Sequence, residues 1–215
     1  MTPETQTVLH AGCGRRRKDH LPSGFRTVAW REMRYDINPD VGPDVVGSIV
    51  DMASIPSNSI DAIYSSHVIE HLYAHEVPKA LGEFHRVLKL DGFAILTCPD
   101  IQSIAEIVAR GQLMEPIYET NAGPISPIDV LYGLRSSIQQ GNTFMAHRSG
   151  FTAQSLLDAL MAAGFVDALT ARTSGFALWA IATRSAVDDE EMAWLREHFL
   201  PPSQATAPDY AGFHE

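Results

Sequence analysis

The sequence predicts an α/β fold with a mostly parallel seven-stranded sheet covered by helices on both faces. Strand-like and helix-like segments alternate through the first hundred residues, which is typical of a parallel sheet. A strand, a Thr-Ser-Gly turn and a strand follow at 164–183, and so short a turn joins only antiparallel strands. The prediction is therefore a Rossmann-like, doubly wound sheet with an antiparallel C-terminal hairpin strand and a helical cap insertion.

The first hundred residues contain five strand-like segments. They share short apolar runs that end at glycine, proline or polar residues, and they are 6–11, 33–37, 43–50, 60–66 and 93–98. A helix is predicted to begin near His67. Residues 77–89 show helical spacing, with Val77, Leu81, Phe84 and Leu88 on one face, and Asp91-Gly92 predicts a turn before the fifth strand.

The segment after Pro99 interrupts the alternation. Residues 101–113 look helical, and 114–150 are rich in Gly, Pro and Asn around a helix near 127–139. A loop-rich insertion of roughly 50 residues is more often functional than accidental. It also follows the carboxyl end of a sheet strand, where open α/β sheets bind ligands. We interpret about 101–150 as a substrate cap, and a structural or dimer-forming arm is the alternative.

The C-terminal part continues with a helix at 153–163, the hairpin, and a helix near 188–199. The apolar stripe of that last helix, Met192, Leu195 and Phe199, would suit a homodimer interface. The tail 200–215 has Pro201-Pro202 near its start and is expected to be poorly ordered or to lie across a neighbour. We expect one domain over 1–184, followed by a helix and tail over 185–215.

Composition excludes several classes of protein. The 215 residues are 45% hydrophobic and 20% charged, as in globular proteins, and the net charge of −10 argues against a nucleic-acid binder. No apolar run is long enough for a bilayer span, and the N-terminus has no secretory pattern. The two cysteines, Cys13 and Cys98, form no C-x-x-C pattern, so a cytoplasmic location is expected.

Positive charge gathers after the first strand. Seven of the 16 Lys and Arg residues fall within 15–34: Arg15, Arg16, Arg17, Lys18, Arg26, Arg31 and Arg34. Such a loop could hold a carboxylate or phosphate of a small ligand, and the alternative is a solvated loop with scattered cations.

Gly12 and Gly14 mark the first junction between a strand and a loop leading to a helix. Glycine allows a tight bend there and close approach of a ligand. Asp36 ends the next strand, and an acid about 20 residues on can bind both hydroxyls of a ribose, although a turn residue is the alternative interpretation. Arg17 stands where a dinucleotide-binding loop has its third glycine, which favours S-adenosylmethionine over NAD.

These features resemble class I S-adenosylmethionine-dependent methyltransferases of the small-molecule type over about residues 1–184. The matching segments are VLHAGCG at 8–14, RYDINP at 34–39, VDMASIPSNSIDAIYSSHVIEHL at 50–72, LGEFHRVLKLDGFAILTCPD at 81–100 and HRSGFTAQSLLDALMAAGF at 147–165. Arg15-Arg16-Arg17 departs from the family, where a further small residue is common.

The resemblance implies roles for individual residues. The methionine and ribose parts of S-adenosylmethionine would lie along His10, Ala11, Gly12, Cys13 and Gly14. Asp36 would bind the ribose hydroxyls, with Ile37 next to it. Asp51 would accept from the adenine amino group and the Met52 backbone would meet the ring edge, although the acidic position could instead fall on Ser48. Ser66 and His67 would lie beside the reactive methyl group.

The sulfonium methyl group is already a strong electrophile, so the protein mainly aligns an acceptor and excludes water. A base is needed only for an acceptor that carries a proton at neutral pH. The candidates are His67, His71, Tyr132 and His147, and His147 is the preferred one, with Arg148 as a residue that could hold an anion.

His67, Glu70, His71 and His75 fall on one stretch, HVIEHLYAH, which is predicted as helical with the three histidines on one face. Taken alone, H-x-x-E-H is an inverted zinc-protease motif. Because the segment fits the methyltransferase pattern and no third-ligand motif is evident, we expect no metal.

The sequence therefore predicts methyl transfer from S-adenosylmethionine to a small-molecule or sugar-like acceptor, at oxygen or nitrogen, with S-adenosylhomocysteine as product. Two alternatives stay open: a protein that binds these ligands without transfer, and an NAD-type oxidoreductase. No nucleic-acid or membrane partner is expected, and a homodimer is compatible with the sequence.

Overall fold

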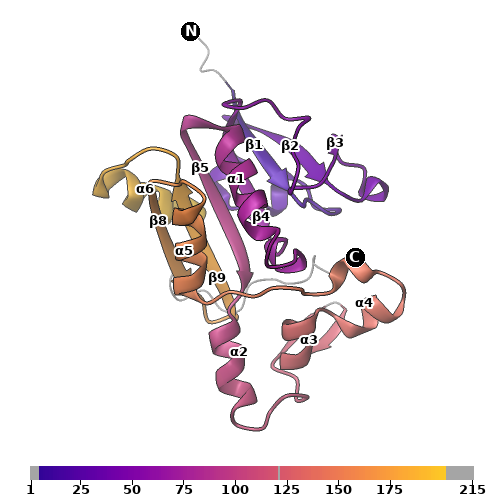
Figure 1. Ribbon diagram of the computed structural model, residues 1–215. Coiled ribbons are helices and arrows are strands. Elements are labelled where there is room, and N and C mark those ends of the chain that lie inside the picture. The colour runs from indigo at the N-terminus through magenta and orange to yellow at the C-terminus, as the bar shows by residue number, and fades with distance from the viewer. Residues whose placement is uncertain (1–4, 121, 202–215) are drawn as a thin grey trace.

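A computed structural model describes residues 5–120 and 122–201 and contains a seven-stranded sheet (Figure 1). The strands lie in the order β3-β2-β1-β4-β5-β9-β8. Their bounds are β1 (Gln6–Ala11), β2 (Trp30–Asp36), β3 (Val45–Val46), β4 (Ile60–Ser66), β5 (Leu88–Pro99), β8 (Asp167–Arg172) and β9 (Ala177–Thr183). Within this seven-stranded sheet, β9 pairs antiparallel to its neighbours β5 and β8 and the other strand pairs are parallel, which confirms the predicted mostly parallel sheet and its hairpin.

Helices cover both faces of the sheet. The described helices are α1 (Val77–Val87), α2 (Ile101–Val108), α3 (Pro127–Tyr132), α4 (Arg135–Gln139), α5 (Ala153–Ala162) and α6 (Asp189–Phe199). Buried residues of α1 and α5 pack on one face, and Leu195 and Phe199 of α6 pack on the other. None of the helices in the described part of the chain combines the length and apolar character needed to cross a membrane.

Strand alternation divides the core between the two faces. Along β5, Leu96 joins the cluster under α1 and α5, whereas Phe93 and Ile95 join the cluster under α6. This is the period of two expected for a strand buried on both sides.

The segment between β1 and β2 contains no α-helix, contrary to the prediction of a loop leading to a helix. It forms two 3-10 turns, η1 (Lys18–His20) and η2 (Ser23–Arg26). Phe25 of η2 lies 4.4 Å from Phe199 of α6 and 5.0 Å from Trp30, measured between ring centroids. Helix α6 therefore shares in covering this face, and the apolar stripe predicted as a dimer interface is largely buried within the chain.

Two local predictions around β4 and β5 are wrong. The helix expected from His67 is only one 3-10 turn, η4 (Ile69–His71), because His67 has a left-handed φ of 53° that breaks helical geometry. His67, His71 and His75 therefore do not share a helix face. Asp91-Gly92 is not a turn: β5 runs through it, and the register with β4 shifts between Ile60 and Ala62.

The cap differs in detail from the prediction. Helix α2 ends at Val108, and a small hairpin of β6 (Tyr118–Thr120) and β7 (Gly123–Ile125) follows it. The helix expected over 127–139 is broken into α3 and α4 at Gly133, whose φ is 92°. A Cβ there would lie 1.9 Å from the Met145 carbonyl oxygen, so glycine is required where η5 (Thr143–Met145) crosses.

These cap elements lie together beyond the carboxyl end of β5 in Figure 1. Helix α3 begins with a capping box, in which Ser126 and Asp129 bond reciprocally, and Pro127 occupies its first turn. Asp129 also pairs with Arg135 at 2.7 Å, so the same carboxylate links α3 to α4. The predicted boundary between the domain and the C-terminal segment, at 184/185, stays a prediction. The part of the predicted tail beyond residue 201 lies outside the described residues.

Candidate active site

A cavity of about 500 Å³ lies between the carboxyl ends of the parallel strands and the cap. Its wall combines loops after β1, β2, β3 and β4 with cap residues. The predicted site residues found in this wall are His10, Gly12, Cys13, Gly14, Asp36, Ile37, Ser66, His67, His71 and His147. One cavity therefore brings together residues that were predicted separately as cofactor-binding and catalytic.

Gly12 and Gly14 shape the loop after β1, with φ values of 69° and 52°. The N–H of Gly12 donates to the Tyr35 carbonyl at 2.8 Å, which ties the loop to β2. A Cβ on Gly12 would lie 2.3 Å from Val68 Cγ2, whereas a Cβ on Gly14 would meet nothing within 4 Å. Glycine at 12 is therefore needed for packing, and Gly14 leaves open space at the cavity.

Asp36 closes the same corner of the cavity. Its Oδ2 accepts from the N–H of Gly14 at 2.8 Å, and its Oδ1 accepts from the N–H of Asn38 at 2.8 Å. A carboxylate oxygen has a second acceptor position, so each oxygen can still accept from a ligand hydroxyl. The arrangement suits a pair of neighbouring hydroxyls, as on a ribose.

Arg34 stabilises the loop after β1 by hydrogen bonds to backbone carbonyl groups. Its side chain is 2% exposed and donates to the carbonyl oxygens of Gly14, Arg16, Val41 and Gly42. The guanidinium therefore joins the loop after β1 to the loop after β2. Sequence reasoning placed Arg34 in a basic loop that could meet an anionic ligand, and it missed this structural role because the four acceptors are backbone atoms.

The expected adenine side is arranged differently from the preferred alignment. Asp51 is exposed and bonds the N–H of Ala53, while the N–H of Met52 donates to Glu83 at 2.7 Å. Neither residue is in the cavity wall, where Ser48, Ile49 and Val50 are found instead. Ser48 is the alternative position that the sequence left open. Ala11 is fully buried behind the loop and is also absent from the wall.

The chain reverses sharply after β4 at His67. The N–H of His67 donates to the Thr97 carbonyl at 2.8 Å, which fixes this left-handed residue beside β5. Nδ1 of His67 lies 3.2 Å from Oε1 of Glu70, the central residue of η4. Glu70 is 1% exposed, so a carboxylate is buried directly behind the turn.

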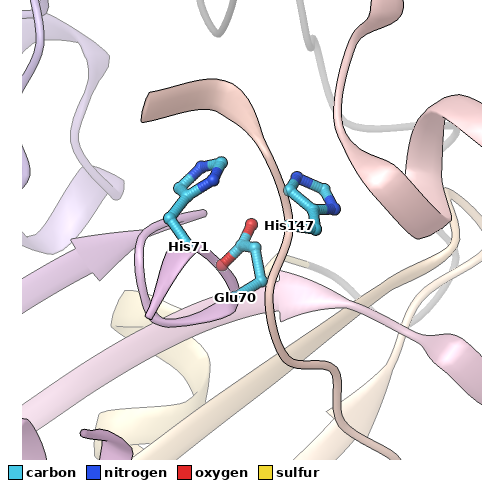
Figure 2. A group of neighbouring side chains, drawn as sticks. All are labelled: Glu70, His71 and His147. Atoms are coloured by element: carbon cyan, nitrogen blue, oxygen red, sulfur yellow. The ribbon is translucent and has the colours of Figure 1, made fainter. Parts of the chain in front are cut away.

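Cap segment 147–149 is attached to η4 by its backbone. The N–H groups of Arg148 and Ser149 donate to the Glu70 carbonyl at 2.8 and 3.1 Å, and Ser149 Oγ donates to the Ile69 carbonyl at 3.1 Å. These bonds bring His147 to the pair Glu70 and His71. The imidazoles of His71 and His147 lie 4.9 Å apart between centroids (Figure 2).

Electrostatics inside this cluster favour an ionised carboxylate and a neutral His147. Burial alone would raise the pKa of Glu70, but the imidazoles of His67, His71 and His147 outweigh it and the pKa falls to about 2. Burial lowers the pKa of His147, although Glu70 acts in the opposite direction. Sequence reasoning selected these histidines and noted Glu70 only as part of the H-x-x-E-H pattern, because its burial beside the three rings depends on the tertiary fold.

Tyr132 and Cys13, two other predicted site residues, lie in different environments. Tyr132 is 63% exposed and outside the cavity wall, and its carbonyl accepts from the N–H of His147. Cys13 is in the wall, where burial raises the pKa of its thiol to about 11, so it stays protonated at neutral pH.

Residues 24–96 match a family model described as a methyltransferase domain. No curated protein sequence matches the chain. Many solved structures share the fold at low identity, among them the following three. An Archaeoglobus fulgidus SAM-dependent methyltransferase is 14% identical over 82% of this chain and 85% of its own, with a TM-score of 0.54.

The second is the Burkholderia thailandensis 1,6-didemethyltoxoflavin-N1-methyltransferase, solved with 1,6-didemethyltoxoflavin and S-adenosylhomocysteine bound. It is 16% identical over 85% of this chain and 72% of its own, with a TM-score of 0.51. The third is a SAM-dependent methyltransferase of Thermotoga maritima, described as a "possible histamine N-methyltransferase". It is 16% identical over 86% of this chain and 84% of its own, with a TM-score of 0.51.

Proposed function

We propose that this chain is an S-adenosylmethionine-dependent methyltransferase and that it methylates a small-molecule acceptor at oxygen or nitrogen. The match of residues 24–96 to a methyltransferase domain supports the first part. The observation that carries the proposal is the single cavity of about 500 Å³ that joins the glycine loop and Asp36 to the histidines and the cap. Its volume falls in the range of small-molecule pockets, roughly 300 to 1,000 Å³.

The cofactor end of the cavity would be formed by the loop after β1 and by Asp36. Open space at Gly14 allows a ligand to approach the backbone, and the two carboxylate oxygens of Asp36 retain acceptor capacity. Ile37 and Ile49 add apolar walls suited to a planar base. S-Adenosylmethionine supplies a sulfonium methyl group that is electrophilic without activation by the protein.

The acceptor would lie at the cap end. Tyr118, Val130, Phe144 and Phe176 give this end apolar and aromatic walls, and Glu70, His71 and His147 add polar groups. A few polar groups in an apolar wall orient small ligands. The wall suits a compact organic acceptor, including a sugar-like one with an apolar face.

His147 is the proposed proton acceptor. Its Nδ1 lies 2.7 Å from the Val130 carbonyl and must carry the proton there, so Nε2 keeps a lone pair. Because burial lowers the pKa of His147, the ring is neutral at pH 7 and can accept a proton from a hydroxyl or ammonium group. His67 and His71 line the same cavity and would orient the acceptor.

Calorimetric titration with S-adenosylmethionine, S-adenosylhomocysteine and NAD tests the cofactor, and an acceptor screen that detects S-adenosylhomocysteine tests transfer. We expect micromolar binding of both sulfur ligands, none of NAD, and turnover with small acceptors. Binding without turnover across hydroxyl and amine acceptors would instead favour a protein that only binds the cofactor. Failure of both sulfur ligands to bind would overturn the proposal.

A further inference from the structure

We propose that Glu70, His71 and His147 bind one divalent transition-metal ion, such as Zn²⁺, at the acceptor end of the cavity (Figure 2). The set is two imidazoles and one carboxylate, and it departs from the expectation of no metal drawn from the sequence. The proposal that an ion binds is argued from the arrangement of these three side chains and does not depend on the proposed function. Only its suggested use, holding an acceptor oxygen, rests on the proposed function.

The three side chains are already gathered. One potential ligand atom from each lies within 4.8 Å of the others. In a tetrahedral site with bonds of about 2.0–2.2 Å, ligand atoms are about 3.4 Å apart. Shifts of about 1 Å in these atoms would therefore bring them to tetrahedral spacing. In Figure 2 the carboxylate of Glu70 lies between the two rings.

Both histidines have a backbone partner on Nδ1. His147 Nδ1 lies 2.7 Å from the Val130 carbonyl, and His71 Nδ1 lies 3.3 Å from the Ala146 carbonyl. A carbonyl oxygen only accepts, so the proton is on Nδ1 and Nε2 is the free ligand atom in each ring. In metal-bound histidines the ring nitrogen that does not bind the metal usually donates its N–H to a carbonyl or carboxylate, as Nδ1 does in both rings here.

Glu70 supplies the negative charge. Its side chain is 1% exposed, and within the described part of the chain neither carboxylate oxygen has a well-aligned hydrogen-bond donor. Nδ1 of His67 lies 3.2 Å from Oε1 and forms an ion pair with it when the ring is protonated. A buried carboxylate is a favourable ligand for a cation, and a metal ion held by two imidazoles would add positive charge beside it.

The backbone holds the ligands in place before any ion binds. Glu70 and His71 occupy η4, and the bonds from Arg148 and Ser149 to the Glu70 carbonyl attach the His147 segment to that turn. Arg148 also donates to the His71 carbonyl at 3.0 Å. A site on rigid, mutually bonded segments loses little conformational entropy on binding. The H-x-x-E-H pattern contains two of the three ligands, Glu70 and His71, but the third could not be identified from the sequence because His147 is far from this pattern along the chain.

The ligand types select the ion and suggest its use. Imidazole and carboxylate together suit Zn²⁺, Fe²⁺, Mn²⁺ and Co²⁺, whereas Mg²⁺ and Ca²⁺ prefer oxygen ligands alone. Three protein ligands leave at least one position open. An acceptor hydroxyl or carboxylate oxygen could occupy it. While the ion is bound, Nε2 of His147 is a ligand and not a base, so the proton of an acceptor hydroxyl would pass to solvent and not to His147. The implied substrate class is thus an acceptor with a metal-binding oxygen.

The test is titration of untagged, chelator-treated protein with Zn²⁺ by calorimetry and with Co²⁺ by visible absorption. We expect one ion per chain with micromolar or tighter affinity. His147→Ala and Glu70→Gln should each weaken Zn²⁺ binding at least about tenfold. The control is His75→Ala, since His75 is exposed on the same stretch and outside the cavity wall. If Glu70→Gln does not fold, by circular dichroism, His71→Ala replaces it.

S-Adenosylhomocysteine binding, measured on the same metal-free samples, separates the two proposals. Loss of Zn²⁺ affinity in the cavity variants with S-adenosylhomocysteine binding retained would support the metal site. No stoichiometric binding of Zn²⁺ or Co²⁺, or equal affinity in His147→Ala and His75→Ala, would overturn it and leave the methyltransferase proposal untouched. Zn²⁺ binding without S-adenosylhomocysteine binding would overturn the methyltransferase proposal alone.

Discussion

The N–H of Gly14 donates to the carboxylate of Asp36 at 2.8 Å, so the loop after β1 and the end of β2 form one unit. Asp36→Ala removes the acceptor for this bond and for a bound ribose. Charged hydrogen bonds contribute about 1.5–3 kcal/mol each, so S-adenosylhomocysteine should bind at least about tenfold more weakly. Calorimetry checks this, with Asp40→Ala as the control, because Asp40 is exposed nearby on the same loop. Equal losses in both variants would contradict the role of Asp36.

Gly12 and Gly14 should respond differently to alanine. Both have positive φ, which costs about 1 kcal/mol for alanine. At Gly12 the new methyl group also meets Val68, and such overpacking adds about 1–3 kcal/mol. Chemical denaturation should show a larger loss for Gly12→Ala than for Gly14→Ala. The Gly12→Ala loss should shrink in a Val68→Ala background, and an unchanged loss would refute the contact.

Arg34→Lys should lower stability and cofactor affinity together. A lysine ammonium cannot reach the four carbonyls that the planar guanidinium bonds. Leaving a buried carbonyl unpaired costs about 1–3 kcal/mol in the free energy of unfolding. Urea denaturation measures it, with Arg17→Lys on the exposed part of the same loop as the control. A change of less than about 0.5 kcal/mol, the usual range for a surface substitution, would be inconsistent with this arrangement.

Stability should fall on mild acidification. Burial lowers the pKa of His10, His85 and His147 below the usual 6.5. At about pH 6.5 and somewhat below, the unfolded chain therefore binds more protons at these sites than the folded chain does. The free energy of unfolding consequently decreases as the pH is lowered. Denaturation at pH 7.5 and 5.5 tests the sign, and His10→Gln should reduce the slope. Greater stability at pH 5.5 would reverse the conclusion.

His147→Ala should reduce turnover by about 100-fold or more if the acceptor loses a proton during transfer. S-Adenosylhomocysteine affinity should change little, because this residue lies at the cap end of the cavity. Steady-state rates and calorimetry on the same preparation measure both, with His75→Ala as the control. Turnover equal to that of the unaltered protein would remove His147 from the proposed mechanism.

The sheet could be predicted from the sequence because its strands are local apolar runs between breakers. The 6–11 and 60–66 strands are found with the predicted bounds, and the 164–183 hairpin has the predicted direction. The places of Asp36 and the glycines at strand ends could also be predicted, since their spacing follows from the order of strand, loop and strand.

The remaining features depend on contacts between distant segments. The left-handed turn at His67 depends on a bond to Thr97, and the break at Gly133 depends on the crossing of Met145. Neither is encoded in the periodicity of its own segment. The meeting of Glu70 with His147 likewise depends on backbone bonds from Arg148 and Ser149.

The aromatic contact between Phe25 and Phe199 has a consequence for biosynthesis. The wall of the sheet beside β1 is completed by α6, which is separated from η2 by most of the chain. Contacts this distant in sequence form late, so a nascent chain would emerge with Phe25, Trp30 and Phe93 uncovered. A nascent chain that lacks α6 would therefore expose this apolar face, and co-translational folding of this protein would finish only when α6 leaves the exit tunnel.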